Sequence, residues 1–592
     1  MAYNSYKEDE KSVEKSKLQT LKRLLSYLLK YKWTIVLVLM LMGYCVVVSL
    51  INPLIIESAI DNHIGNKDYI GLYKLLIIAL IINLIATFAI KLRMYIMAKM
   101  CNQILLTIRQ ELYTHIQKLG FKFFDSRPTG KILSRIIGDI NSLKDVLSNC
   151  VTTLIPDFIT VCAVVIIMFS KNPKLAVAAL ISTPFMAIAI TMIQVKAHPR
   201  WQTFRKKSSN LNAFLHEDMS GMKIIHSFTA EKETEETFDE LLNEHKSSFR
   251  SAVRLSDCFG SVIDFSWGFG CVALYFIGIV VLKDENISVG TFLAFGTYIN
   301  MFWQPINNLS NFYNQITTNI AGAERIFEIL DTKPEIEDEK GVVDLPDIKG
   351  EVTFDHVTFG YDEEKVLDDV SFVIKPGETI AIVGPTGAGK STIINLISRF
   401  YDANEGRVLL DGYDVKDVSI ESLRKQVGTM TQENFIFSGT VKDNIRYGKL
   451  DATDEEMYEA CRLAYADHFI NTLEDGYDTS INEESNNISQ GQKQLLTIAR
   501  AFLANPKILI LDEATSSVDT RTEVLIQRGM DKLMEGRTSF IIAHRLSTIK
   551  DANTIIVMKD GDIVELGNHE SLLAKNGFYA ELYQSQFESS HE

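Results

Sequence analysis

Cysteine is scarce in this sequence: 592 residues contain seven cysteines, and no two of them form a Cys-x-x-Cys pair. They are scattered and odd in number, so their spacing indicates neither a zinc site nor a disulfide framework. We therefore expect free, packed thiols in a reducing environment. The tail as far as Lys17 has no short apolar core and no small-residue cleavage site, so it does not indicate a cleavable signal peptide.

A clustered basic face is also missing. The formal net charge is −15, which argues against a general nucleic-acid binder. Hydrophobic residues make up an ordinary 46% of the chain, but they are unevenly distributed. Long apolar runs crowd residues 1–320, and the remainder reads as a mixed, charged, soluble sequence.

Six segments are long and apolar enough to cross a bilayer, which takes about 20 mostly apolar residues. They are 33–56, 72–92, 147–169, 175–195, 259–282 and 289–315. The third contains Asp157, and the sixth is rich in Asn and aromatic residues, as a water-lined helix would be. We expect an all-α transmembrane domain in contact with the lipid bilayer.

Lys and Arg are concentrated ahead of the first segment and in the connections after the second and fourth segments. The other connections, 57–71, 170–174 and 283–288, are short. Because positively charged loops stay on the cytoplasmic side, both termini and the two long connections are expected in the cytoplasm. The prediction is a multi-pass protein of the cell (plasma) membrane, and in 18–31 leucines at helical spacing predict a helix on its inner surface.

The two long connections each exceed 50 residues and show helical periodicity with few breakers. We interpret them as transmembrane helices that continue far into the cytoplasm. The first connection is expected to turn at the polar stretch 125–130 and the second at 220–223. Both turns would then be placed to touch a cytoplasmic domain.

From about Gly350, short β-branched runs alternate with amphipathic helices, which is typical of an α/β domain. The predicted strand 379–383 and the predicted helix 392–400 flank a match to the phosphate-binding loop G-x-x-x-x-G-K-[ST]. The loop comprises Gly384, Pro385, Thr386, Gly387, Ala388, Gly389, Lys390, Ser391 and the following Thr392. Its glycines let backbone N–H groups converge on phosphates, Lys390 would reach the β- and γ-phosphates, and the Ser391 hydroxyl would bind Mg²⁺.

A second apolar strand, 508–511, delivers Asp512 and Glu513 at its end, about 120 residues after the loop. Asp512 is expected to hold Mg²⁺, and Glu513 to act as the general base that polarises the attacking water. Together the two strands predict ATP and Mg²⁺ as the ligands.

The chain resembles the ABC transporters at the stretch Asn487-Ile488-Ser489-Gln490-Gly491-Gln492, which is similar to their signature motif. The resemblance spans about residues 15–585 and includes Phe123-Phe124-Asp125 and Pro128-Thr129-Gly130, as in type-I exporter half-transporters. It implies roles for four residues outside the loop. Tyr361 would stack on adenine, Gln432 would sense Mg²⁺, Asp519 would belong to the D-loop after Ser516-Ser517-Val518, and His544 would contact the γ-phosphate.

The implied fold is a six-helix transmembrane domain with long cytoplasmic helix extensions, followed by an α/β P-loop ATPase domain. The expected divisions are a charged tail at 1–17, the transmembrane domain at 18–325, a linker at 326–348 and the nucleotide-binding domain at 349–592.

One phosphate loop and one signature per chain imply a dimer, because in this family each ATP lies between the loop of one subunit and the signature of the other. Ser489, Gln490, Gly491 and Gln492 would serve the partner's ATP. Gln490 stands where Gly is usual, and the segment 482–487 lacks the Gly residues common there. These departures favour a heterodimer of two bacterial half-transporters over a homodimer, although Gln can be tolerated in homodimers too.

The expected activity is ATP hydrolysis coupled to export of amphipathic or hydrophobic drugs, lipids or peptides by alternating access. A lipid flippase is one alternative, and an ATP-gated sensor or channel without net pumping is another. Asp157 and Asp264 could attract a cationic amphiphile, or each could pair with a neighbouring helix or lie near a membrane boundary. Trp267, Phe292, Phe302, Trp303 and Pro305 suggest an apolar lining, which does not discriminate between these cargoes.

Overall fold

The computed structural model describes residues 17–282, 287–338, 341–361, 364–431, 434–482, 487–512, 519–542 and 549–585. The chain divides into two compact units. The helical unit comprises Met1–Ile116 and Gly130–Asp331, and the α/β unit comprises Gln117–Thr129 and Thr332–Glu592.

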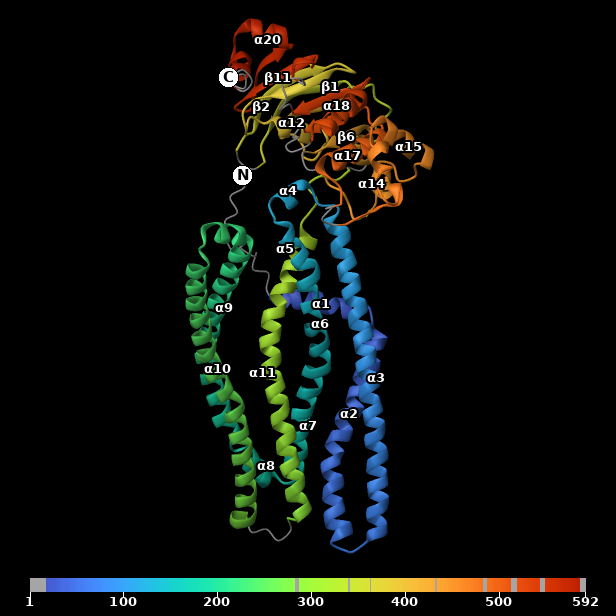
Figure 1. Cartoon of the computed structure of the whole chain (residues 1–592). Helices are drawn as coiled ribbons and strands as arrows, with labels where there is room; N and C mark the ends of the chain where they lie inside the picture. The colour runs from blue at the N-terminus through green and yellow to red at the C-terminus, as the bar shows by residue number, and fades with distance from the viewer. Residues whose placement is uncertain are drawn as a thin grey trace. The chain divides into compact units, whose positions relative to one another are not determined.

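The helical unit contains long helices (Figure 1) and short π-helical turns, to which we give the label η. They are α1 (Lys17–Leu29), α2 (Lys32–Ser58), η1 (Ala59–Ile64), α3 (Tyr69–Ile116), α5 (Thr129–Ser134), η2 (Arg135–Asp139), α6 (Ile140–Asn149), η3 (Cys150–Leu154), α7 (Ile155–Lys171), α8 (Pro173–Leu180), α9 (Thr183–Phe228), α10 (Glu231–Phe276), η4 (Ile277–Leu282) and α11 (Val289–Asp331).

Five helical stretches of the described residues are long and apolar enough to span a membrane. They are Lys32–Ile64, Tyr69–Ile116, Thr129–Lys171, Pro173–Phe228 and Glu231–Val280, and they carry the first five expected segments. The sixth expected segment lies on α11, which is one continuous helix. It is not among the five, because polar residues such as Asn300 and Gln304 interrupt its apolar sequence.

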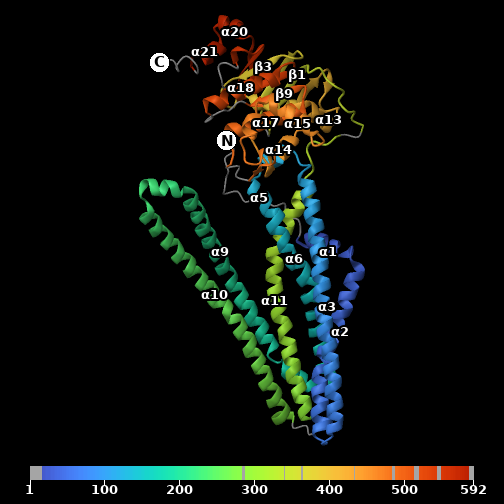
Figure 2. The same cartoon turned by 45° about the vertical axis from the view of Figure 1, so that its right-hand side comes forward.

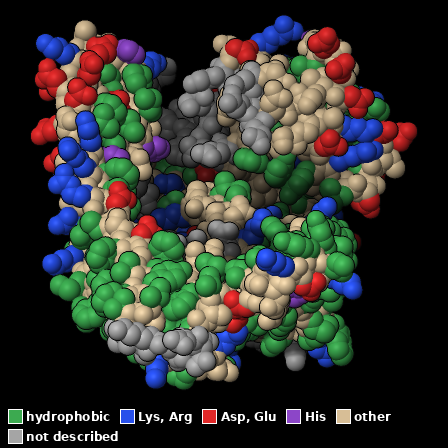
Figure 3. All heavy atoms as spheres, turned by 90° about the horizontal axis from the view of Figure 1, so that it is seen from below, with side chains coloured by type: hydrophobic (Ala, Val, Ile, Leu, Met, Phe, Trp, Pro, Cys, Tyr) green, Lys and Arg blue, Asp and Glu red, His purple; other side chains and the backbone are tan. Residues whose placement is uncertain are grey.

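The surface of these helices is apolar where a soluble protein would be polar. On α3 the side chains of Leu76, Ile77, Leu84 and Phe88 are 53–68% exposed. Hydrophobic side chains cover large parts of the surface in the view from below (Figure 3). A helix satisfies its own backbone hydrogen bonds, so such a surface suits contact with lipid.

The predicted N-terminal helix is confirmed as α1, but one of its faces packs against protein. Leu24 and Leu28 are buried. The Arg23 guanidinium donates to Asp331 at 2.7 Å, and the Tyr27 hydroxyl donates to Glu111 at 2.7 Å. The helix is therefore anchored to the ends of α3 and α11, and its place at the membrane surface stays a prediction.

The second long connection does not turn at 220–223, as the sequence suggested. Helix α9 is unbroken there and ends at Phe228, and α10 begins at Glu231. The chain reverses at Thr229, whose φ of 54° is left-handed, and the Ala230 N–H closes the helix on the Ile225 carbonyl at 3.0 Å. A single Gly costs a helix only about 1 kcal/mol, so Gly221 does not end α9.

Three sheets are formed by the described residues of the α/β unit. Strands β1 (Val352–Phe359), β2 (Leu367–Ile374), β4 (Glu405–Leu410) and β5 (Tyr413–Asp414) form an antiparallel sheet of order β2-β1-β4-β5. Strands β3 (Thr379–Val383), β6 (Val427–Met430), β9 (Ile508–Asp512), β10 (Thr538–Ile542), β11 (Thr554–Lys559) and β12 (Asp562–Gly567) form the main sheet, of order β12-β11-β3-β10-β9-β6. Its strands are parallel except β12. Strands β7 (Gly439–Thr440) and β8 (Ser480–Ile481) pair separately.

The helices of this unit are α4 (Phe121–Asp125), α12 (Lys390–Ile397), α13 (Ile420–Gln426), α14 (Val441–Arg446), α15 (Asp454–Leu463), α16 (Asp467–Ile470), the 3₁₀ turn η5 (Gly476–Asp478), α17 (Gln490–Ala504), α18 (Thr520–Met534), α20 (His569–Lys575) and α21 (Phe578–Tyr583). The two faces of the main sheet carry different helices. Ile508 and Ile510 of β9 are buried in one apolar cluster with α12, whereas Leu509 and Leu511 are buried in another with α17. Because successive side chains of a strand point to opposite faces, α12 and α17 lie on opposite sides of the sheet.

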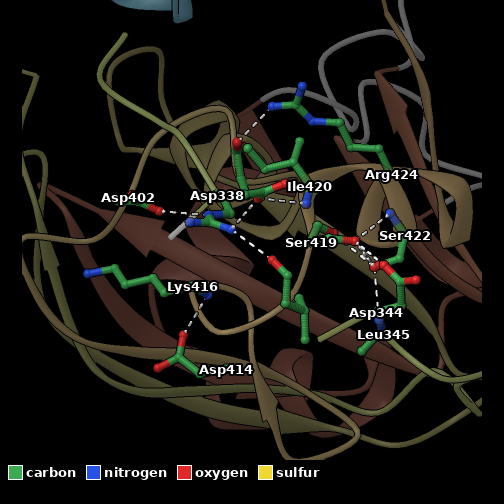
Figure 4. Close-up of polar contacts among 12 residues, drawn as sticks. Asp338, Asp344, Leu345, Asp402, Asp414, Lys416, Ser419, Ile420, Ser422 and Arg424 are labelled. Atoms are coloured by element: carbon green, nitrogen blue, oxygen red, sulfur yellow. Dashed lines mark hydrogen bonds and ion pairs between the residues drawn. The ribbon is translucent and has the colours of Figure 1, made fainter. Parts of the chain in front are cut away.

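The expected linker 326–348 is partly helix and partly a fixed element of the α/β unit. Helix α11 continues to Asp331. Farther on, Asp338 accepts from the Ile420 N–H at 3.0 Å, and Asp344 accepts from the Ser419 hydroxyl at 2.6 Å (Figure 4). The Leu345 N–H donates to the Ser422 hydroxyl at 2.8 Å, so this stretch is fastened to the start of α13.

Candidate nucleotide site

The phosphate loop connects β3 to α12, as the sequence predicts. Its glycines have φ angles of 152° at Gly384, 87° at Gly387 and 96° at Gly389, which a side chain would strain. A Cβ at Gly384 would lie 2.3 Å from the Met558 carbonyl oxygen, and one at Gly389 would lie 2.8 Å from Leu367. The loop therefore needs glycine at Gly384 and Gly389 for both conformation and space, and at Gly387 for conformation.

Lys390 begins α12 and folds back over the loop. Its ammonium group donates to the carbonyls of Gly384 at 2.7 Å and Pro385 at 2.8 Å. Burial lowers the pKa of Lys390, and the negative charge of Asp512 opposes this shift. A half-buried cation that donates to neutral carbonyls is well suited to exchange them for phosphate oxygens.

Asp512 reaches the same edge of the sheet from β9. It is in register with Ile542 of β10, which is in turn in register with Ile382 of β3. The carboxyl ends of β3 and β9 thus lie one strand apart. This confirms the predicted strands and brings the carboxylate of Asp512 to the loop.

The hydroxyl of Ser391 and the carboxylate of Asp512 are hard oxygen donors of the type that Mg²⁺ prefers. No group of three or more His, Cys, Asp or Glu side chains in the described part of the chain could hold a metal by itself. Two protein oxygens with phosphate oxygens and water as the other ligands suit this ion, so the residues present fit Mg²⁺ bound together with ATP.

Tyr361 lies beside the first turns of α12. Its hydroxyl is 3.2 Å from the Thr392 hydroxyl, and the Asn395 amide donates to it at 3.2 Å. The ring meets Tyr401 edge-on with centroids 5.0 Å apart. The aromatic residue is therefore next to the phosphate loop, while its stacking on adenine stays a prediction.

The signature segment lies across the main sheet from the loop. Ser489 is the N-cap of α17 and forms a reciprocal capping box with Gln492, so the N-terminus of this helix is well defined. Gln490 is exposed at the first helical position, and Gly491 is buried. The Asn487 side-chain amide donates to the Ser480 carbonyl at 2.8 Å.

Asp519 is the N-cap of α18, and the Thr522 N–H donates to its carboxylate at 3.0 Å. This bond lowers the pKa of Asp519. Gln432, Glu513 and His544, the three predicted catalytic residues, lie outside the described residues, as do 516–518.

The side chains proposed to face cargo are divided by the structure. Asp157 on α7 hydrogen-bonds Asn308 on α11, and Asp264 on α10 is exposed. Phe302 and Trp303 are buried in the core of the helical unit, and Trp267 is 40% exposed. The structure therefore gives Asp157 a helix partner, the second of the two alternatives.

A contact that the sequence did not predict joins α4 to the segment that follows α12. The Tyr401 hydroxyl, just after α12, donates to the Asp125 carboxylate, and Phe121 packs on Phe400 with centroids 4.5 Å apart. Burial, and then the bond to Asp125, raises the pKa of Tyr401. The predicted turn at 125–130 is confirmed, with its break between α4 and α5, but no pattern in the sequence pairs Asp125 with a tyrosine 276 residues away.

Comparison with known proteins identifies both units. Residues 33–306 match the family described as the ABC transporter transmembrane region, and residues 367–516 match the family described as ABC transporter. Over 576 residues the chain is 41% identical to an uncharacterized ABC transporter ATP-binding protein, YknV, of Bacillus subtilis, with 96% of this chain and 95% of that protein covered. This chain belongs to the ABC transporter family.

Two further relatives add detail. A fatty acid ABC transporter ATP-binding/permease protein of Mycobacterium bovis is 40% identical over 516 residues, covering 87% of this chain and 82% of that protein. The solved structure of a bacterial Atm1-family ABC exporter with ATP bound superposes with a TM-score of 0.78 at 28% identity, covering 94% of this chain and 98% of that one. This ABC transporter chain therefore has the architecture of an exporter half, a helical transmembrane domain followed by one ATPase domain.

Proposed function

We propose that this chain is one half of a dimeric exporter that couples ATP hydrolysis to outward movement of amphipathic or hydrophobic molecules across the cell membrane. The observation that carries the proposal is the pairing of one phosphate loop with one helical transmembrane domain in a single chain. Both termini and the α/β unit would lie in the cytoplasm, where ATP is available.

In this proposal the chain's own residues bind ATP through the loop amides, Lys390 and Ser391, with Tyr361 against the base. Ser391, Asp512 and Gln432 would hold Mg²⁺, which neutralises developing phosphate charge when it is bound. Glu513 would take a proton from the attacking water, and His544 would contact the γ-phosphate.

The placement of α12 and α17 on opposite faces of the sheet supports a dimer. Helix α12, which follows the loop, and helix α17, which follows Ser489, pack in separate apolar clusters, so one chain is not expected to bring both helix N-termini to the same nucleotide. A helix N-terminus favours an anion, and Ser489 with the free N–H groups of α17 would serve the partner's γ-phosphate. ATP would close this sandwich, and hydrolysis would release it.

The partner is proposed to be a different half-transporter. Gln490 places a long polar side chain, exposed in this chain, where the signature would meet the partner's nucleotide. Such a departure would weaken only the site that receives this signature, whereas Glu513 would keep this chain's own site hydrolytic. Purification of the chain alone as a dimer with full, cargo-stimulated ATPase activity would contradict the heterodimer.

The cargo is proposed to be lipid-like. The relative from Mycobacterium bovis is named for fatty acids, which supports a lipid-like cargo for this chain. A lipid flippase is the same proposal with a bilayer lipid as cargo, and an ATP-gated sensor is the competing one. Reconstituted vesicles with fluorescent fatty acids, phospholipids and cationic dyes would separate these outcomes, because only a pump accumulates its cargo against a gradient.

The test of the enzymatic assignment is Glu513→Gln in the purified dimer. We expect ATP binding to be retained and hydrolysis to fall about 100-fold or more, since general-base catalysis contributes roughly 10²–10⁴. Glu535→Gln at the exposed end of α18 is the matched control and should leave the rate unchanged. Undiminished hydrolysis in Glu513→Gln would overturn the assignment of the base.

A further inference from the structure

Three connections of the helical unit meet at the end opposite the α9–α10 turn (Figure 1). They are η1 after α2, the end of α7, and the start of α11. Polar side chains from all three form what we call the hairpin-end cluster: Glu57, Asp61, Lys171, Ser288 and Thr291. Charged groups at the ends of apolar helices are normally left in water, so their mutual contacts need an explanation.

Glu57 at the end of α2 contacts both α7 and α11. The Lys171 ammonium at the end of α7 pairs with one of its carboxylate oxygens, and the Thr291 hydroxyl on α11 donates to the other at 2.9 Å. The Glu57 side chain is only 16% exposed. Charge-assisted bonds with little water around them are stronger than exposed ion pairs.

Asp61 on η1 caps the start of α11. Its carboxylate accepts from the Gly290 N–H at 3.0 Å and from the Ser288 hydroxyl. Ser288 in turn is 2.8 Å from the Thr291 hydroxyl, which connects the two acidic residues in one network. An acidic group at a helix N-terminus is favourable, so Asp61 stabilises α11 only while η1 stays against it.

Gly290 makes this close approach possible. A Cβ at this position would lie 2.5 Å from a carboxylate oxygen of Asp61 and 2.7 Å from the Glu57 carbonyl oxygen. Any larger residue would push η1 and α2 away from α11. The close packing of η1 and α2 against α11 therefore depends on the absence of a side chain at Gly290.

The opposite ends of the same helices are arranged differently. The α9–α10 hairpin diverges from the other helices toward its turn, while the ends near the cluster stay together (Figure 2). Helices that are joined at one end and apart at the other can open at the joined end only if the contacts there break.

We propose that the hairpin-end cluster is a latch on the outer face, which fastens the α2–α3 hairpin to α7 and α11 and opens in every transport cycle. The proposal rests on the proposed function, because it takes alternating access and the cytoplasmic orientation of the α/β unit as given. Glu57 and Asp61 act on one side of the latch, and Lys171, Ser288, Gly290 and Thr291 act on the other.

The test measures the separation of the two sides directly. Spin labels are placed at Asn62 on η1 and Val289 on α11, which are exposed neighbours of the latch, in a background without the seven native cysteines. The labelled chain is assembled with an unlabelled partner subunit so that each dimer carries one labelled pair. The distance between the labels should be short without nucleotide and should lengthen with Mg²⁺ and a non-hydrolysable ATP analogue.

Gly290→Ala is the variant that should weaken the latch without changing its charges. We expect the ratio of open to closed molecules without nucleotide to rise roughly tenfold, equivalent to about 1.4 kcal/mol. Gly268→Ala on α10, where a Cβ would have nothing within 4 Å, should leave the ratio unchanged. If Gly290→Ala does not fold, its size-exclusion peak will be lost. Thr291→Val, which removes one hydroxyl of the latch, then provides a second and milder test.

The two proposals fail in different ways. Equal label distances with and without nucleotide, in a chain that hydrolyses ATP and accumulates cargo, would overturn the latch and leave the exporter intact. A chain that neither hydrolyses ATP nor accumulates any cargo would overturn the proposed function. An unchanged open ratio in both Gly290→Ala and Thr291→Val would also overturn the latch.

Discussion

The two turns that join the long helices differ in how the chain makes them and in what surrounds them. The first is α4, a short helix that begins after Gly120, ends at Asp125, and is followed by Pro128. It is part of the α/β unit, with Phe123 buried. The second is only Thr229 and Ala230 between two 46-residue helices, next to Phe228 at 79% exposure.

The difference teaches what a turn needs in order to be recognised. Around α4, glycine and proline break the helix on both sides, and these residues give a signal that can be read without coordinates. At the second turn, the break is a left-handed threonine, and the only conspicuous glycine lies eight residues earlier inside a helix. A helix ends where its last carbonyl groups are capped by other hydrogen bonds, and composition alone does not reveal that position.

The largest expected effect lies at the first turn, in the bond between Tyr401 and Asp125. Tyr401→Phe keeps the ring packed against Tyr361 and removes only the hydroxyl. A hydrogen bond to a charged acceptor contributes about 1.5–3 kcal/mol, so we expect coupled transport to fall roughly tenfold or more, with ATP binding little changed. Initial rates of cargo uptake and of ATP hydrolysis in the same vesicles measure the effect.

Asp125→Asn should give a similar loss, and the double variant should be no worse than either single one, because both remove the same bond. Tyr413→Phe on β5, with a ring that is 45% exposed, is the control for removing a tyrosine hydroxyl from this unit. Additive losses in the double variant would show that the two residues act separately.

The α/β unit illustrates how far a sequence can carry a prediction. Strands 379–383 and 508–511 and the glycines between β3 and α12 were predictable because each residue type performs a local task, such as a positive φ or a buried strand. The docking of Asp338 and Asp344 on α13, in a stretch expected to be a linker, was not predictable. Polar contacts between distant segments leave no periodic pattern, and the same is true of Tyr401 with Asp125.

A smaller effect is expected from Thr229→Gly at the second turn. A β-branched residue in the left-handed region is strained by roughly 1–2 kcal/mol, and glycine removes this cost but adds flexibility to the unfolded chain. We expect a net gain of about 1 kcal/mol, seen as a higher melting temperature of the detergent-solubilised protein. Thr234→Gly, in the first turn of α10, should instead be destabilising, and equal effects of the two substitutions would exclude strain at Thr229.

The smallest effect is expected from Gly221→Ala, which tests directly where the second of the two turns lies. If 220–223 formed a turn, alanine would disturb it, but inside a continuous α9 alanine should stabilise the helix by about 0.5–1 kcal/mol. A Cβ at Gly221 would have nothing within 4 Å, so no steric cost offsets this gain. Thermal melting measures the stability of the variant, and cargo uptake measures its transport activity. A higher melting temperature with unchanged uptake supports the uninterrupted helix. A lower melting temperature would mean that the chain turns at Gly221, and that both turns are made by the same kind of residue.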